Sequence, residues 1–146
     1  MRQLKLKIRY KAAVLLTLLL SIQTAVAEEH LSPDEIEGAN TIDAEMLIEL
    51  AGKHDNLIII DSRIHSDRRQ GYIANSVSLP DTETNCSSLF RVIFRKNTPV
   101  VFYCNGPRCR RSDNAVKIAS DCGYTDIYWF RGGFEEWLNK EYFITR

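Results

Sequence analysis

Two cysteines and three arginines share one short segment of the chain, CNGPRCRRS at residues 104–112. A cysteine becomes a nucleophile as the thiolate, and nearby positive charge favours that form. Arg108, Arg110 and Arg111 supply such charge, and the N-terminus of the helix expected to follow adds to it. The sequence therefore indicates Cys104 as a catalytic nucleophile.

The same segment is suited to hold a small anion next to the sulfur. Backbone N–H groups of a loop that leads into a helix bind anions, and Gly106 allows the tight curvature of such a loop. The three arginines cannot all point inward, and we expect Arg110 to contribute most. The candidate substrate-binding residues are Asn105, Gly106, Arg108, Arg110, Arg111 and Ser112.

Cys109 gives this loop a second thiol, five residues after Cys104. A thiol beside a nucleophilic one resolves a persulfide or a sulfenic acid by forming a disulfide, so Cys109 is a candidate redox or resolving residue. The alternative is a permanent Cys104–Cys109 disulfide in a binding or redox module without turnover. The C-x4-C pair lacks the C-x2-C spacing of zinc ribbons, so we expect no metal there, and the chemistry expected of Cys104 calls for no cofactor.

Two further cysteines, Cys86 and Cys122, complete the set of four. Cys122 falls on the apolar face of an expected helix, where we expect it to pack as a small buried side chain. Cys86 follows a polar segment, and its pairing stays open because four cysteines allow three full pairings.

The first 27 residues have the three parts of a secretory signal peptide. MRQLKLKIRYK carries five Lys or Arg and no acid, AAVLLTLLLSIQ is largely apolar, and Ala25-Val26-Ala27 forms an Ala-x-Ala cleavage site. The apolar run is shorter than the roughly 18 residues of a membrane span. We expect cleavage after Ala27, export to the periplasm or beyond, no stable membrane insertion afterwards, and an oxidising environment for the cysteines.

The 119 residues after this leader suit a single domain. They carry fourteen Lys and Arg against nineteen Asp and Glu, a net charge of about −5. That charge argues against nucleic acid or an anionic membrane surface as partner. We expect a flexible lead-in over residues 28–40 and one domain over residues 41–146.

Hydrophobic periodicity predicts short apolar strands that alternate with helices. The predicted strands are residues 57–61, 76–80, 99–104 and 126–130, and the predicted helices are residues 41–56, 86–94, 112–123 and 134–141. Thr41 or Asp43 is expected to cap the first helix, whose apolar face holds Ala44, Leu47, Ile48 and Ala51. Ser112 is expected to cap the third helix, with Gly123 just past its end. This alternation is typical of an α/β fold with a parallel sheet, whose ligands bind beyond the carboxyl ends of the strands.

Three ordered segments resemble the rhodanese family of sulfurtransferases. They are IIIDSRIHSDRRQGYIANSVSLP (58–80), VVFYCNGPRCRRSDNAVKIASDCGY (100–124) and FRGGFEEW (130–137), and the likeness extends over about residues 40–143. The resemblance implies a five-stranded parallel sheet with helices on both faces. It also implies that a small anionic sulfur donor such as thiosulfate gives its outer sulfur to Cys104, which passes it to a thiol or other nucleophile. Asp61 and Arg63 match the family's Asp-x-Arg, which braces the loops around the site.

Two departures from the family pattern keep other functions open. Gly71-Tyr72-Ile73 stands where the family often has Gly-His-Ile, and we expect the three histidines of the chain at the surface. Counting from Cys104 to Arg110 gives C-x5-R, a longer loop that resembles those of rhodanese-related cell-cycle phosphatases and arsenate reductases. A phosphatase or arsenate reductase-like activity is therefore an alternative, and it would need a general acid that the sequence does not offer near the loop.

Overall fold

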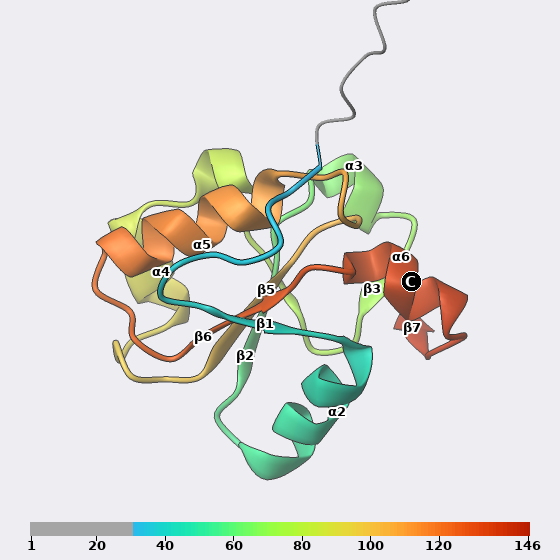
Figure 1. Ribbon diagram of the computed structural model, residues 1–146, viewed down its shortest axis with the longest axis horizontal. Helices are drawn as coiled ribbons and strands as arrows, with labels where there is room; N and C mark the ends of the chain where they lie inside the picture. Colours follow the sequence, from blue (N-terminus) through green and yellow to red (C-terminus); the bar gives the residue numbers. More distant parts are fainter. Residues whose placement is uncertain (1–30) are drawn as a thin grey trace, which may run out of the picture.

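Short β-branched and aromatic runs of the sequence form parallel strands in the computed structural model, which describes residues 31–146 (Figure 1). In chain order the elements are β1 (Asn40–Ile42), α2 (Ala44–Lys53), β2 (Ile58–Asp61), α3 (His65–Arg68), β3 (Tyr72–Ile73), β4 (Val77–Ser78), the 3-10 turn η1 (Asp81–Glu83), α4 (Cys86–Val92), β5 (Val100–Tyr103), α5 (Arg111–Asp121), β6 (Ile127–Phe130), α6 (Gly133–Asn139) and β7 (Ile144–Thr145).

The strand β5 lies at the centre of a five-stranded sheet of order β1-β6-β5-β2-β4, in which every pair is parallel. All four residues of β5 are buried, as expected for a strand with neighbours on both edges and helices on both faces. A separate antiparallel pair joins β3 to β7. The sheet confirms the expected fold class, and the β3–β7 pair is an element that the sequence did not predict.

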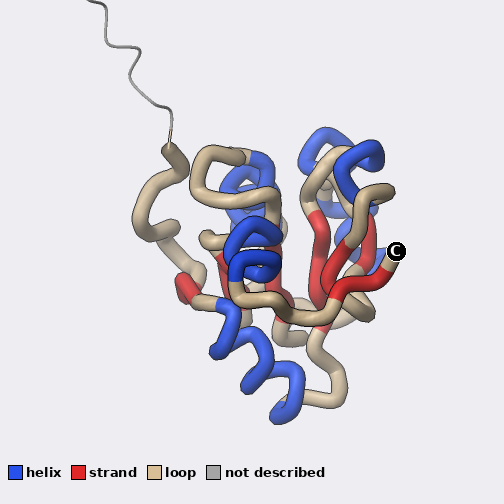
Figure 2. The backbone as a smooth tube through the Cα atoms, turned by 90° about the vertical axis from the view of Figure 1, so that its right-hand side faces the viewer, coloured by secondary structure: helices blue, strands red, loops and turns tan. Residues whose placement is uncertain are grey.

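Helices cover both faces of the sheet and divide the interior into two cores (Figures 1 and 2). On one face, α4 and α5 pack over Ile60, Phe102 and Trp129. On the other face, α2 and α6 pack over Ile59, Val101 and neighbouring strand residues. Because successive strand residues point to opposite faces, one run of apolar residues supplies both cores.

The helix α2 confirms one of the two predicted caps and corrects the predicted apolar face. The side chain of Asp43 accepts a hydrogen bond from the Met46 N–H at 2.8 Å. Ile48 is 45% exposed and Ala51 is also exposed, whereas Leu50 is buried. The helix is therefore rotated relative to the predicted stripe, because Leu50 packs into the core together with Ala44 and Leu47.

The helix α5 begins one residue earlier than predicted, at Arg111, with Arg110 as its N-cap residue. The prediction that Ser112 caps this helix is therefore wrong. Ser112 lies inside the first turn, and its Oγ accepts a hydrogen bond from the indole Nε1 of Trp129 at 2.9 Å. Gly123, with φ of 85°, follows the end of the helix as predicted.

Residues 31–40 pack along the domain, in contrast to the flexible lead-in expected over 28–40. Ser32 and Ile36 are buried, and Asn40 begins β1, which pairs with β6 at the edge of the sheet. We call residues 31–36 the strap. The expected leader, residues 1–27, lies outside the described residues. Within residues 31–146 no helix is both long and apolar enough to cross a membrane.

Candidate active site

Cys104 directly follows β5 at the carboxyl end of the central strand. Its residue is 2% exposed, and its sulfur is bonded to that of Cys109 with the two Cα atoms 6.2 Å apart. The structure therefore brings together the two cysteines of the loop. It places them beyond the carboxyl ends of the parallel strands, as the sequence predicted.

The N-terminus of α6 binds one side of the loop. The N–H of Phe134 donates to the Cys104 carbonyl at 2.8 Å, and the N–H of Glu135 donates to the Asn105 carbonyl at 2.7 Å. Gly133 permits this approach: its φ is 60°, and a Cβ there would overlap the Cys104 carbonyl. The Gly-Gly turn of the sequence thus has a role that the sequence analysis did not assign.

The strap binds the other side of the loop through Ser32, which the sequence analysis also missed. The Ser32 N–H donates to the Pro107 carbonyl at 2.7 Å, and the Ser32 Oγ donates to the Cys109 carbonyl at 3.1 Å. Arg131 fixes the strap in turn, since its guanidinium donates to the Ser32 and Pro33 carbonyls at 3.1 and 2.8 Å. No local sequence signal marks Ser32, because its partners lie more than 70 residues away.

These contacts orient four peptide groups of the loop. In a planar trans peptide the C=O and the following N–H point in opposite directions. The carbonyls of residues 104, 105, 107 and 109 are bound by α6 and by the strap, so the N–H groups of residues 105, 106, 108 and 110 face away from those partners. With the N-terminus of the 11-residue α5 beside them, they form an arrangement suited to an anion.

Ser62 is a further buried residue at the carboxyl end of the sheet. It follows β2 as Cys104 follows β5, and the parallel register that pairs Asp61 with Tyr103 sets Ser62 beside Cys104. Ser62 is fully buried, and within residues 31–146 its Oγ has no hydrogen-bond partner. A buried hydroxyl left unpaired is costly, and a bound anion would satisfy it.

The three arginines of the loop differ in their surroundings. Arg110 Nε lies 3.3 Å from Asp113 Oδ2, and Arg111 Nη1 lies 2.9 Å from Asp81 Oδ1. Arg108 is exposed. All three, together with Cys109, border a surface depression. We call it the Cys109 depression, and it is lined by Asp81, Arg108, Cys109, Arg110, Arg111 and Asn114.

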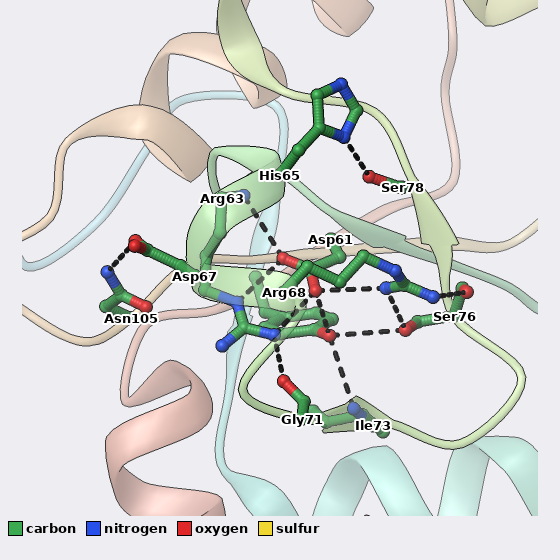
Figure 3. Close-up of polar contacts among 11 residues, drawn as sticks. Asp61, Arg63, His65, Asp67, Arg68, Gly71, Ile73, Ser76, Ser78 and Asn105 are labelled. Atoms are coloured by element: carbon green, nitrogen blue, oxygen red, sulfur yellow. Dashed lines mark hydrogen bonds and ion pairs between the residues drawn. The ribbon is translucent and has the colours of Figure 1, made fainter. Parts of the chain in front are cut away.

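Two other predicted site residues have structural partners. The Nδ2 of Asn105 donates to Asp67 Oδ2 at 2.8 Å, which links the loop to α3 (Figure 3). Ser112 is 2% exposed, and its hydroxyl is occupied by Trp129. Gly106 packs against α6, where a Cβ would clash with the carboxylate of Glu135. Gly106 therefore permits close packing against α6, and its φ does not lie in the left-handed region that the expected tight curvature would favour.

Asp61 and Arg63 form a buried ion pair below the loop (Figure 3). Arg63 Nε and Nη2 donate to the two carboxylate oxygens at 2.9 and 2.7 Å. Arg68 Nη1 and the Tyr103 hydroxyl donate to Asp61 Oδ2 at 3.0 and 2.7 Å. Arg63 Nη2 also donates to the Gly71 carbonyl at 2.8 Å. The pair is a bracing element that ties β2, β5 and the turn before β3 together.

Burial on its own raises the pKa of Asp61. The hydrogen bonds and charge of Arg63, with the hydrogen bond from Tyr103, outweigh burial and hold that pKa below its usual value. Burial and the charge of Asp61 raise the pKa of the Tyr103 hydroxyl. Tyr103 therefore stays protonated and acts as a donor, and Asp61 stays charged.

The remaining cysteines form a second disulfide, Cys86–Cys122, with a Cα–Cα distance of 5.4 Å. Cys122 packs against the core as expected, although it is only partly buried, and the pairing that the sequence left open is with Cys86. Cys122 is the C-cap residue of α5 and Cys86 the first residue of α4, so the bond joins the ends of two adjacent helices. Periodicity showed which face Cys122 occupies, and it could not show that the start of α4 lies against it.

Two of the histidines, His54 and His65, lie outside the loop that carries Cys104. His65 is largely exposed and contacts Glu83 and Ser78, and His54 follows α2. His30 falls outside the described residues. Within residues 31–146 no group of three or more His, Cys, Asp or Glu side chains is arranged to hold a metal ion.

The fold and the loop together define the class of α/β domains that present a cysteine-containing loop at the carboxyl end of a central parallel strand. The chain belongs to the rhodanese-like domain family, whose model matches residues 43–140.

Three comparisons illustrate the likeness. An HTH-type transcriptional regulator of Mycobacterium tuberculosis is 26% identical over 82% of this chain and 54% of its own length. The human single domain sulfurtransferase TSTD1 aligns with a TM-score of 0.57 and 22% identity, over 70% of this chain and 97% of that one. A thiosulfate sulfurtransferase from Pseudomonas aeruginosa aligns with a TM-score of 0.60 and 17% identity, over 74% and 20%. The chain spans little more than half of the length of the curated relative.

Proposed function

We propose that this protein is a sulfurtransferase that takes a sulfane sulfur from a small anionic donor such as thiosulfate and carries it as a persulfide on Cys104. The observation that carries the proposal is the loop after β5. Four of its carbonyls accept hydrogen bonds from α6 and the strap, so the four N–H groups of the same peptides point away from α6 and the strap. The structural similarity to proteins named as sulfurtransferases supports it.

The proposed reaction has two displacements at sulfur. The Cys104 thiolate attacks the outer sulfur of thiosulfate, the S–S bond of the donor breaks, and sulfite leaves with the bonding electron pair. The backbone N–H groups and the Ser62 hydroxyl would stabilise the negative persulfide. An acceptor thiolate then attacks the outer sulfur of the persulfide and regenerates the Cys104 thiolate. No step requires a cofactor.

The Cys104–Cys109 disulfide blocks this chemistry until it is reduced. The same bond favours a second candidate function, a thiol/disulfide redox or binding module in which the two cysteines only exchange electrons. The phosphatase or arsenate reductase-like alternative requires Arg110 to cover a bound oxyanion. Nothing in the structure favours that alternative, since Arg110 is half exposed and paired with Asp113.

The test is a single-turnover reaction of the reduced protein with thiosulfate. We expect one sulfite per protein, and in the Cys109→Ser variant we expect the intact mass to rise by one sulfur atom. Cys104→Ser removes both signals, and Cys86→Ser with Cys122→Ser serves as the matched control and keeps them. If the reduced protein releases no sulfite and gains no sulfur, the redox or binding module replaces the sulfurtransferase.

We further propose that the protein works after export, in the periplasm, as the leader pattern of residues 1–27 predicts. Its partners in this proposal are the anionic donor and a thiol acceptor. Nucleic acid is not among them, because the mature chain is acidic overall and the arginines near Cys104 form a small local cluster.

A further inference from the structure

We propose that Cys109 resolves the Cys104 persulfide, so that the protein reduces sulfane sulfur and releases it as hydrosulfide. The inference rests on the proposed sulfurtransferase function and adds an activity to it. Thiosulfate would be the substrate, sulfite and hydrosulfide the products, and an external thiol the reductant. A simple transferase needs one cysteine, whereas this loop holds two within bonding distance.

The geometry of the loop supports an attack by Cys109. The N–H of Cys109 donates to the Gly106 carbonyl at 2.9 Å, and this turn brings Cys109 back toward Cys104. The Cα–Cα distance of 6.2 Å lies within the range of disulfides. Because α6 and the strap fix the loop, Cys109 is held beside Cys104, and an intramolecular attack has a large advantage over a bimolecular one.

The two cysteines of the loop differ in their exposure to solvent. Cys104 is 2% exposed, while Cys109 is partly exposed and borders the Cys109 depression. An external thiol therefore meets Cys109 before it meets the inner sulfur of a Cys104 persulfide. Cys109, already inside the loop, reaches that inner sulfur directly.

The step balances as follows. The Cys109 thiolate attacks Cys104 Sγ, the bond between the two persulfide sulfurs breaks, and hydrosulfide leaves with its electron pair. The sulfane sulfur is reduced by two electrons, and the two cysteines are oxidised to the disulfide that the structure contains. An external dithiol then attacks Cys109, forms a mixed disulfide there, releases the Cys104 thiolate, and leaves as its own disulfide.

The charges around the Cys109 depression fit this cycle. Arg108, Arg110 and Arg111 border it, against the carboxylates of Asp81 and Asp113 that pair with two of them. These guanidinium groups lie close to Cys109 and offer positively charged partners to an anionic reductant such as a thiolate.

The experiment uses the mature protein after reduction and removal of the reductant, mixed with one equivalent of thiosulfate. We expect one sulfite and one hydrosulfide per protein. The intact mass should be lower than that of the reduced protein by two hydrogens, which marks the new disulfide. Cys109→Ser should release sulfite, release no hydrosulfide, and keep the added sulfur. Cys86→Ser with Cys122→Ser should behave as the parent.

The outcomes separate the two proposals. Sulfite without hydrosulfide from the parent protein, with a stable sulfur adduct, overturns the resolving role of Cys109 and leaves the sulfurtransferase intact. No sulfite overturns the sulfurtransferase itself. Hydrosulfide released equally by Cys109→Ser also overturns the inference, because the resolving thiol would then lie elsewhere.

Discussion

Asp61 is fully buried and yet receives hydrogen bonds from Arg63, Arg68 and Tyr103. A buried charge is stable in a protein only when such partners compensate its lost hydration. The partners come from the segment after β2, from α3 and from β5, so this one carboxylate of β2 joins these parts of the chain near the candidate active site. Removing its charge leaves the guanidinium groups of Arg63 and Arg68 without the negative charge that they pair with.

We predict that Asp61→Asn lowers the free energy of unfolding by about 3–5 kcal/mol, the cost of breaking a buried ion pair from one side. Urea unfolding followed by tryptophan fluorescence measures it. Asp55→Asn, an exposed position after α2, is the matched control and should change little. A loss for Asp61→Asn no larger than that of the control would show that the network contributes nothing to stability.

The same carboxylate predicts a pH dependence. Its pKa is lowered in the folded protein, so the folded state binds this proton less readily than the unfolded chain. The stability that Asp61 contributes is complete above the unfolded pKa of about 3.9 and is lost as pH falls through the lower folded pKa. Between neutral pH and acid, Asp61→Asn should therefore show a shallower loss of stability than the parent. Parallel curves in urea titrations at several pH values would contradict this.

At the scale of elements, the strap acts on the loop through hydrogen bonds from Ser32. Its Oγ bond to the Cys109 carbonyl helps to orient the peptide that carries the Arg110 N–H. One such bond contributes about 1 kcal/mol, so we predict that Ser32→Ala slows sulfite release from thiosulfate about fivefold. Rapid-quench measurement of sulfite checks the rate.

The control for this prediction is Ser87→Ala, at an exposed position of α4. It should leave the rate unchanged. Ser32→Thr keeps a hydroxyl and should recover part of the rate that Ser32→Ala loses. An equal rate for Ser32→Ala and the parent would mean that the main-chain bonds alone position the loop.

Local patterns predicted the central elements and missed those whose stability comes from distant contacts. The apolar run 100–103 is recognisable as a buried strand because β-branched and aromatic residues dominate it. The strand at 40–42 has the sequence NTI and only one partly buried residue, so no periodicity marks it. It forms because β6 offers an open edge. The same holds for the two-residue strands β3 and β7, whose paired residues lie more than 70 positions apart in the sequence.

The candidate site was predictable in composition and only partly in geometry. Cys104 and the loop stand out because their residue types are unusual together. Ser32, Ser62 and Gly133 do not stand out in the sequence, because the fold alone brings them to the loop. Ser32 binds the Pro107 carbonyl, Ser62 is placed by the register of β2 and β5, and Gly133 lies against the Cys104 carbonyl. Ser112 was predicted as the N-cap residue of α5. The helix begins at Arg111, so Ser112 lies in its first turn and accepts a hydrogen bond from Trp129.

At the scale of the whole molecule, the Cys86–Cys122 bond closes a loop with a sequence separation of 36 residues that includes β5 and the candidate site. In the chain-entropy account such a loop contributes about 3–4 kcal/mol. We predict that Cys86→Ser with Cys122→Ser lowers the free energy of unfolding by about that amount. Urea unfolding without reductant measures it. With reductant the parent should approach the variant, and a gap that persists would mean that the serines themselves disturb the helix ends.

Structural disulfides such as Cys86–Cys122 persist mainly in oxidising compartments, and the export proposed from the leader pattern of residues 1–27 would bring the chain to one. We predict that the full chain, expressed in a bacterial host, appears in the periplasmic fraction with Glu28 as its first residue and all four cysteines oxidised. A chain that starts at residue 28 after an initiating Met should remain in the cytoplasm with alkylatable thiols. Thiol alkylation before and after reduction, read by intact mass, distinguishes the two.

The matched control for export is Leu16→Arg, which places a charge in the apolar part of the leader. It should keep the chain uncleaved and its thiols reduced, while the described domain is unchanged. Recovery of the parent chain from the cytosol with its N-terminus intact would contradict export. The resolving cycle proposed for Cys109 would then depend on cytoplasmic reductants, which keep both thiols reduced and shift its resting form from the disulfide to the dithiol.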